Sequence, residues 1–515
     1  MKSAAKERLI RATVRLAIPL VGGGVIACSL PPIGPWFLAP VGLGALFLIS
    51  EDRSAACRAR IGALVGIGQF SIGCAFALEF TGLGYVVLVG FESVLVALTC
   101  VAIPPRRARL AGFVGAVTLL EWVRYTWPFG GMPLGGITLS QSGGPFADVA
   151  RIGGPLVVAA AAATLGAGFG SLGGAVLATT RHQPNTRSYV WGAIAIVASG
   201  IVAVAGAVTG DGGRAVRFAS IAIVQGGGRR GVTSLEVPPT RSFGATAAVI
   251  RRVRGPIDLV VCPEDALALD GPLSGSRKAA LFASFARRLH ATLLAGVTIP
   301  VDRTRFLNEI VAFGPNGAVI GRIEKVHPVP FGEYVPLRSL VEKIANLNSV
   351  PRDVIVGHNN GALSTPAGRL AILNSYEAFF TGRGRNSVRA GAEILVVETN
   401  TSSYATSQAP AMELAASRLQ AIAEGRTLVQ AATTGYSAVI SPDGSIEISS
   451  RLGRPSLISA RVALRSGETL YDRLGDAWVV VVALVALSLA WSVEVVGRRK
   501  ARYRSGELGG ADRLA

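Results

Sequence analysis

Arg369-Leu-Ala-Ile-Leu-Asn-Ser-Tyr-Glu377 contains a short apolar run bounded by Gly368 and by polar Asn374-Ser375. This pattern predicts a buried strand that ends in a tight corner, with a helix beginning at Glu377. A strand-to-helix corner displays one side chain at the rim of a sheet, which is a common way to present a nucleophile. That side chain is Ser375. The alternative interpretation is an ordinary strand end with a serine helix cap.

Apolar residues are unevenly distributed along the 515-residue chain, half of which is hydrophobic. Residues 10–209 and 477–497 are dense in Ala, Val, Leu, Ile and Gly, whereas residues 214–475 have the composition of a soluble α/β domain. A chain of this length is expected to hold two or three domains. We therefore expect an integral membrane protein with a membrane domain in 1–209, a globular domain in 210–475, and a last span with a basic tail in 476–515.

Eight apolar segments have about the 17–25 residues that are needed to cross a bilayer. They are residues 13–29, 34–50, 59–78, 82–103, 108–126, 153–178, 188–209 and 477–497. Basic residues gather before the first segment, after the last, and in every second loop between them, which is typical of cytoplasmic loops. We therefore expect both termini in the cytoplasm and the 210–475 domain on the outer side of the cell membrane.

The formal net charge of +19 could indicate a nucleic-acid partner. However, the arginines cluster at the ends of apolar segments, and the globular part has no basic–aromatic motif. Both observations disfavour nucleic-acid binding. One segment also carries charge within it, since Glu121-Trp-Val-Arg124 lies near the outer end of the fifth span. Such groups are costly in a membrane, so we expect them either to be functional or to pair as an interfacial anchor.

Strand and helix patterns alternate in the globular part, which predicts sheets covered by helices. Expected strands are 218–225, 257–262, 292–298, 307–313, 318–325, 370–374, 393–398, 427–433 and 437–441. Expected helices are 242–253, 276–290, 338–345, 377–388 and 411–424.

Three polar residues follow expected strands directly: Glu264, Lys325 and Ser375. Strand ends are where the sites of α/β domains gather, and a carboxylate at such a rim can act as a general base. Lys325 is one of only six lysines among 51 basic residues. An ammonium has a tunable pKa that a guanidinium lacks, so this lysine suggests a chemical role, although a surface position is the alternative.

Other chemistries have less support. The five cysteines include only Cys262 in the globular part, which excludes a disulfide framework or a CxxC metal site there. No phosphate loop, G-x-S-x-G motif or zinc pattern occurs. A Ser-His-Asp triad through His327 or His358 has no spacing support but stays open. We expect neither a cofactor nor a metal.

The order Glu264, Lys325 and a strand-end nucleophile resembles the Glu-Lys-Cys triad of the nitrilase (carbon–nitrogen hydrolase) superfamily. With membrane spans on both sides, the chain resembles the apolipoprotein N-acyltransferase family over nearly its whole length. The motifs that carry the resemblance are Val224-Gln225-Gly226, Pro263-Glu264, Lys325-Val-His-Pro-Val-Pro-Phe-Gly-Glu-Tyr-Val-Pro336, Ser375-Tyr376-Glu377, Tyr471-Asp-Arg-Leu-Gly-Asp476 and Glu121-Trp-Val-Arg124.

This resemblance implies an α-β-β-α sandwich on an eight-helix base in a bacterial cell membrane. It also implies a two-step reaction, in which a phospholipid acylates the enzyme and the acyl chain then passes to the N-terminal amine of a diacylglyceryl-cysteine apolipoprotein. Glu264 would be the general base and Lys325 would stabilise the oxyanion. Ser375 stands at the nucleophile position, with Glu333, Tyr376 and Glu377 in supporting roles.

Two features depart from the family pattern. Ser375 replaces the nucleophilic Cys, and an alcohol is harder to ionise than a thiol. Asn400-Thr-Ser-Ser-Tyr404 replaces a run that holds Asp and Trp in the family. Cys262, two residues before the base, lies on the wrong strand to substitute as the thiol. Two alternatives therefore stay open: a catalytically silent homologue that binds lipoproteins or partners an active paralogue, and a membrane-tethered amidase.

Overall fold

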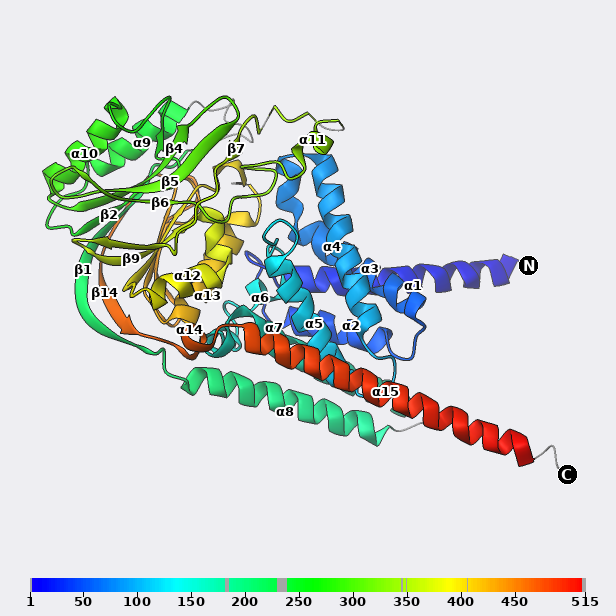
Figure 1. Ribbon diagram of the computed structural model, residues 1–515. Helices are drawn as coiled ribbons and strands as arrows, with labels where there is room; N and C mark the ends of the chain where they lie inside the picture. Colours follow the sequence, from blue (N-terminus) through cyan, green and yellow to red (C-terminus); the bar gives the residue numbers. More distant parts are fainter. Residues whose placement is uncertain are drawn as a thin grey trace.

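The computed structural model describes residues 2–180, 185–228, 239–343, 346–348, 350–404 and 406–511. Helices from both ends of the chain form a helical base, and the middle of the chain forms an α/β domain beside it (Figure 1). The last helix, drawn in red, lies against the base although it follows the domain in sequence. Helices from the two ends of the chain therefore lie together, and the expected domain bounds stay a prediction.

A helix coincides with each of the eight expected spans. These helices are α1 (Lys2–Cys28), α2 (Leu38–Ile49), α3 (Ala55–Gly73), α4 (Gly82–Ala102), α5 (Arg109–Thr126), α7 (Ala150–Thr180), α8 (Thr186–Val208) and α15 (Ala477–Ala511). Small residues let them approach closely. For example, a Cβ atom added to Gly44 of α2 would lie 2.8 Å from the carbonyl oxygen of Gly166 in α7, so only glycine fits there.

Four segments within the described residues are long and apolar enough to cross a membrane by length and composition: Gly82–Ala102, Ala147–Thr180, Thr186–Val208 and Ala477–Ala501. Two shorter apolar helices, Thr13–Cys28 and Leu38–Ile49, belong to the same base. Helices α3 and α5 carry charged residues along their length, such as Arg58 and Glu121, which lowers their hydropathy. The base is therefore a membrane-type helical bundle, and the number of spans stays a prediction.

The α/β domain contains two sheets. The first has the strand order β14-β1-β2-β4-β5-β6, with β3 beside β4 and β7 beside β5; the second has the order β13-β12-β11-β10-β9-β8. The strands of the first sheet are β1 (Gly213–Gln225), β2 (Leu259–Val261), β3 (Leu267–Ala268), β4 (Thr292–Pro300), β5 (Arg305–Phe313), β6 (Val319–Glu324), β7 (Asp353–Val354) and β14 (Ser456–Gly467). The strands of the second are β8 (Ala362–Thr365), β9 (Gly368–Asn374), β10 (Ile394–Thr399), β11 (Leu428–Ala432), β12 (Ala438–Ile440) and β13 (Ile446–Ser449).

Alternate residues of these strands point to opposite faces of each sheet, so the domain has three apolar layers. Ile221 of β1 and Ile372 of β9 belong to one apolar core between the sheets. The outer face of the first sheet packs on α9 (Pro239–Ile250) and α10 (Arg277–Leu289). The outer face of the second sheet packs on α12 (Thr381–Arg389) and α13 (Ala409–Glu424). This layering is the α-β-β-α sandwich that the resemblance implied.

Three expectations about the domain need correction. The expected helix over 377–388 is interrupted, because a 3₁₀ turn, η3 (Ser375–Phe379), is followed by Phe380 in extended geometry (φ −112°, ψ 93°) before α12 begins. The expected helix over 338–345 is the short α11 (Arg338–Val341), and residues 344–345 lie outside the described part. Strand β14 was not expected, since its sequence mixes arginines and serines with apolar residues.

The base and the domain share a continuous apolar core. Tyr376, Phe379 and Phe380 of the corner after β9 belong to the same buried cluster as residues of α3 and α5. Met412 of α13 joins the same cluster, as does Tyr471 of α14 (Leu470–Leu474). Burial of aromatic side chains is a large stabilising contribution, so this contact fixes the domain firmly on the base.

Candidate active site

Ser375 lies at a strained corner between β9 and η3. Its φ angle of +54° is in the left-handed region, which is uncommon for residues other than glycine. Its side chain is 9% exposed. The corner is the expected one, with the strand buried on both faces and the serine at its carboxyl end. Strained backbone of this kind persists only where the surroundings hold it.

Glu377 holds this corner. Its Oε2 atom accepts a hydrogen bond of 2.9 Å from the backbone N–H of Asn374, and its Oε1 atom accepts bonds of 2.7 and 3.2 Å from the backbone N–H groups of Val326 and His327. The Arg383 guanidinium lies 3.3 Å from Oε2. Glu377 therefore links the segment after Lys325 to the segment before Ser375, and its supporting role in a reaction stays a prediction.

Glu264, Lys325 and Glu333 form one buried ionic cluster. Lys325 Nζ lies 2.9 Å from Glu264 Oε1 and 2.8 Å from Glu333 Oε1. The Asn308 side-chain amide donates to the same two oxygens, at 2.9 and 2.6 Å. The backbone N–H of Asn400 donates to Glu264 Oε2 at 3.0 Å. Both carboxylate oxygens of Glu264 are thus engaged.

Opposite charges in this cluster stabilise the ionised forms of Lys325 and Glu264. Burial by itself would lower the pKa of Lys325, but the carboxylates of Glu264 and Glu333 outweigh it and hold that pKa above its ordinary value. Burial raises the pKa of Glu264, and the Lys325 ammonium opposes the shift. Lys325 therefore stays charged, as a group that is to stabilise an oxyanion must.

Ser375 is hydrogen-bonded away from this cluster. Its Oγ atom lies 3.2 Å from Oγ1 of Thr399, the last residue of β10. Thr399 Oγ1 donates in turn to Oε1 of Glu413 in α13, at 2.6 Å. Among the contacts of the described residues, none joins Ser375 to the carboxylate of Glu264. Neither Thr399 nor Glu413 was expected from the sequence.

Ser375 opens into a cavity between the domain and the base. The lining residues from the base are Phe76, Met132 and Leu134; those from the domain are Val329, Ser375, Tyr376, Phe379, Asn400, Thr401, Tyr404, Ala409 and Glu413. Aliphatic and aromatic side chains make up most of this lining, and Asn400, Thr401 and Glu413 add polar groups beside the hydroxyl of Ser375. Such a cavity suits a ligand with an apolar chain and one reactive group.

Three further residues that the sequence analysis named are Tyr376, His327 and Cys262. Tyr376 points to the base, where its hydroxyl donates 2.9 Å to the carbonyl oxygen of Gly131. His327 stacks on Phe380 at 4.6 Å between ring centroids, and its Nδ1 atom has no hydrogen-bond partner among the described residues. A triad through His327 is therefore not formed. Cys262 is fully buried in the layer under α9 and α10.

Arg124 in the base is paired, as one interpretation of Glu121-Trp-Val-Arg124 expected. Its guanidinium lies 2.7 Å from Glu92 and 3.2 Å from Glu121. It also donates to the carbonyl oxygens of Met132 and Leu134, at 3.0 and 2.6 Å. The cluster is buried, and it holds the loop that lines the cavity.

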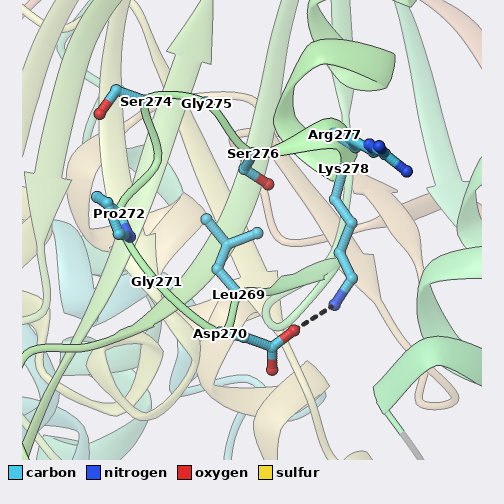
Figure 2. A pocket seen from close by; sticks show the side chains of 9 residues that line it. All are labelled: Leu269, Asp270, Gly271, Pro272, Ser274, Gly275, Ser276, Arg277 and Lys278. Carbon is cyan, nitrogen blue, oxygen red and sulfur yellow. Dashed lines mark ion pairs between the residues drawn. The ribbon is translucent and has the colours of Figure 1, made fainter.

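A second, open hollow lies in the loop between β3 and α10, lined by Leu269, Asp270, Gly271, Pro272, Ser274, Gly275, Ser276, Arg277 and Lys278. Figure 2 shows the Lys278 side chain extending toward Asp270, with the two charges 3.9 Å apart. It holds none of the expected site residues. Among the described residues, no three His, Cys, Asp or Glu side chains gather as a metal site would require.

Comparison with known families agrees with this arrangement. Residues 22–168 match the apolipoprotein N-acyltransferase N-terminal domain, and residues 221–469 match the carbon-nitrogen hydrolase family. The fold and site thus define a carbon–nitrogen hydrolase domain attached to a membrane-type helical base. Within that class, the chain belongs to the apolipoprotein N-acyltransferase family.

Several relatives carry the name apolipoprotein N-acyltransferase. The protein from Geobacter metallireducens is 35% identical over 46% of this chain and 46% of its own length, so the match spans less than half of that relative. The Mycolicibacterium smegmatis protein is 28% identical over 91% of this chain and 84% of its own. The Photobacterium profundum protein is 24% identical over 95% and 96%.

Solved structures of carbon–nitrogen hydrolases resemble the domain more distantly. A carbon-nitrogen hydrolase from Helicobacter pylori G27 is 15% identical, covering 48% of this chain and 90% of its own, with a TM-score of 0.37. A mutant amidase from Nesterenkonia sp. AN1 is 18% identical, covering 50% and 96%, with a TM-score of 0.36.

Proposed function

We propose that this protein transfers an acyl chain from a phospholipid to the N-terminal amine of diacylglyceryl-cysteine apolipoproteins. The observation that carries the proposal is the cavity at Ser375, because the helical base and the α/β domain line it together. An enzyme that draws an acyl chain from a bilayer needs a nucleophile that opens toward apolar helices. Relatives that match most of the chain bear the name of this activity.

The reaction would proceed through an acyl-enzyme. Ser375 would attack the ester carbonyl of the phospholipid, and the charged Lys325 would stabilise the oxyanion that forms. A carboxylate on each side, from Glu264 and Glu333, supports Lys325 in that role. The general-base role of Glu264 stays a prediction. The α-amine of the apolipoprotein would then attack the acyl-enzyme and release Ser375.

Mass spectrometry of lipoprotein N-termini tests the function. The chain would be produced in a bacterial strain depleted of its own apolipoprotein N-acyltransferase. We expect the wild-type chain to restore N-acylated lipoproteins, Ser375→Ala to abolish them, and Ser364→Ala, at an exposed position on β8, to behave as wild type. Unchanged N-acylation with Ser375→Ala would remove Ser375 from the mechanism.

A catalytically silent homologue is the second candidate. The observation in its favour is that Ser375, where the family has Cys, shares no hydrogen bond with Glu264 among the described contacts. Such a protein would leave the lipoproteins of the same strain without the N-linked acyl chain. A Ser375→Cys variant that restores N-acylation where the wild type does not would favour this candidate, and activity of the wild type would exclude it.

We also propose that all eight helices cross the membrane, with the domain on the outer side and both termini in the cytoplasm. The arginine-rich loops alternate as this topology requires. Alkaline phosphatase fused after Asp211 should be active, and the same reporter fused after Lys500 should be inactive. The reverse pattern would overturn the orientation, and two active fusions would overturn the number of spans.

A further inference from the structure

Three side chains from three elements form a hydrogen-bonded row that begins at Ser375. Ser375 Oγ from η3 lies 3.2 Å from Thr399 Oγ1 at the end of β10, and Thr399 Oγ1 lies 2.6 Å from Glu413 Oε1 in α13. The exposed fractions are 9%, 0% and 3%. The row is thus enclosed, and the contact with Glu413 is as short as charge-assisted hydrogen bonds are.

The number of hydrogens sets the direction of this row. A threonine hydroxyl carries one hydrogen, and Thr399 donates it to the Glu413 carboxylate. While Glu413 is ionised, Thr399 must then accept and Ser375 must donate in the contact between the two hydroxyls. The proton of Ser375 therefore points toward Glu413, which leaves the lone pairs of its oxygen for a ligand.

Glu264 is placed less well to take this proton. Its Oε1 atom already accepts from Lys325 and Asn308, and its Oε2 atom accepts from the backbone of Asn400. No hydrogen bond between Glu264 and Ser375 occurs among the described contacts. Burial raises the pKa of Glu264 to about 7, so Glu264 is disfavoured by the lack of a contact with Ser375 among the described residues and not by weak basicity.

Glu413 has the properties of a proton acceptor near neutral pH. Burial raises its pKa to about 7, and the hydrogen bond from Thr399 opposes part of that shift. Glu264 raises this pKa further, and the Lys325 ammonium lowers it. Tyr404, whose own pKa is raised mainly by burial, lines the same cavity as Glu413. A base with a pKa near the working pH is the most effective one.

We propose that Thr399 and Glu413 relay the proton of Ser375, in place of the base that a cysteine nucleophile would use. This inference rests on the proposed function and adds two residues to its site. Thr399 touches the nucleophile, and Glu413 is a positioning residue that receives the proton through Thr399.

The first step would then balance as follows. The Ser375 proton moves to Thr399 as the Thr399 proton moves to Glu413, and the Ser375 oxygen bonds to the ester carbonyl carbon. The tetrahedral intermediate collapses with cleavage of the ester C–O bond. The departing alkoxide takes a proton back from Glu413 through Thr399 and leaves as a lysophospholipid. Ser375 is left as an acyl ester.

Labelling of the full-length protein in detergent with an alkyl fluorophosphonate tests the relay without an acyl acceptor. This probe forms an O–P bond with an activated serine and releases fluoride, while the serine proton goes to the base. We expect wild-type Ser375 to be labelled, and both Glu413→Gln and Thr399→Val to slow labelling by about 10²–10⁴-fold. Thr399→Ser restores the hydroxyl and should remain within a few-fold of wild type.

A matched control lies on the same helix. Glu424 is also fully buried in α13, but it does not line the cavity, so Glu424→Gln should label as wild type does. The labelling rate of the wild type should rise with pH around a midpoint near 7, and Glu413→Gln should lack that rise. A change in packing alone would lower the rate without removing its pH dependence.

The relay is overturned if wild-type Ser375 is not labelled, if Glu413→Gln labels at the wild-type rate, or if that variant keeps the same pH dependence. The proposed function fails separately, since labelling that depends on Glu413 could persist in a protein that acylates no lipoprotein. Conversely, N-acylation by the wild type with no effect of Glu413→Gln would remove the relay and leave the proposed function standing.

Discussion

The hydroxyl of Tyr376 donates a hydrogen bond of 2.9 Å to the carbonyl oxygen of Gly131, across 245 positions of sequence. Tyr376 directly follows the candidate nucleophile, and Gly131 belongs to a loop of the helical base. Arg124 binds the same loop from the other side, through the carbonyl oxygens of Met132 and Leu134. Ser375 is therefore linked to the buried Arg124 guanidinium through Tyr376 and this loop.

Tyr376→Phe should weaken this tie while keeping the packing of the ring. One buried hydrogen bond contributes about 1 kcal/mol, so we expect at most roughly a fivefold loss in the rate of N-acylation and a fall of only about a few degrees in melting temperature. The measurement is the initial rate of acyl transfer by the purified protein. Tyr189→Phe, in α8, removes a more exposed hydroxyl contact and should keep the wild-type rate. Equal rates for both variants would contradict a role for the tie.

Arg124→Ala should destabilise the whole protein. The substitution leaves the Glu92 and Glu121 carboxylates buried without their partner, and breaking a buried ion pair in this way costs about 3–5 kcal/mol. Thermal unfolding in detergent should show a clear fall in melting temperature. The control is Arg106→Ala, which removes an exposed ion pair with Asp52 and should change the melting temperature little. A melting temperature for Arg124→Ala that matches this control would refute the prediction.

Glu377→Gln should disturb the corner at Ser375. A glutamine has one oxygen where Glu377 uses two, and its amide group would face the backbone N–H of Asn374 or of Val326. We expect a loss of about 2 kcal/mol in stability, because buried donors lose their acceptor. Urea or thermal unfolding measures the loss, with Glu324→Gln on the exposed face of β6 as control. Equal stability of the two variants would show that Glu377 is dispensable.

The raised pKa of Glu413 makes stability depend on pH. Since the folded protein binds this proton more tightly than the unfolded chain, stability falls as pH rises from about 4.5 to about 7. Above pH 7 the folded state bears the full cost of the buried charge, about 3 kcal/mol. Glu413→Gln lacks that charge, so it should match the wild type at pH 5 and be more stable at pH 8. The melting temperatures of the two proteins at both pH values check this, and a constant difference would contradict it.

Local pattern was enough to predict the parts of the site that follow strands. Lys325 directly follows β6 and Glu264 comes three residues after the end of β2, so apolar runs followed by a polar residue marked both of them. The eight long helices of the base were predictable for a similar reason, since each contains a mostly apolar segment. In both cases the residues that make up the pattern lie within or next to the strand or helix that they predict.

Features set by contacts between distant segments could not be predicted. Strand β14 pairs with β1 over residues such as Ala463 opposite Phe218, and nothing near Ala463 reveals that partner. Glu413 lies in a helix whose sequence does not show which face meets Thr399. Asn308 had a weak signal, as a polar residue within the apolar strand β5, but only the fold brings it to Lys325 and Glu264.

The apolar cluster that joins Tyr376, Phe379 and Met412 to the helices of the base has a consequence for biogenesis. These side chains would be uncovered in a fragment of residues 210–475, next to the corner that holds Ser375. Such a fragment should aggregate rather than fold as an independent unit. We therefore expect the globular domain to require the helical base in order to fold, and the corner at Ser375 to form only after the membrane part is in place.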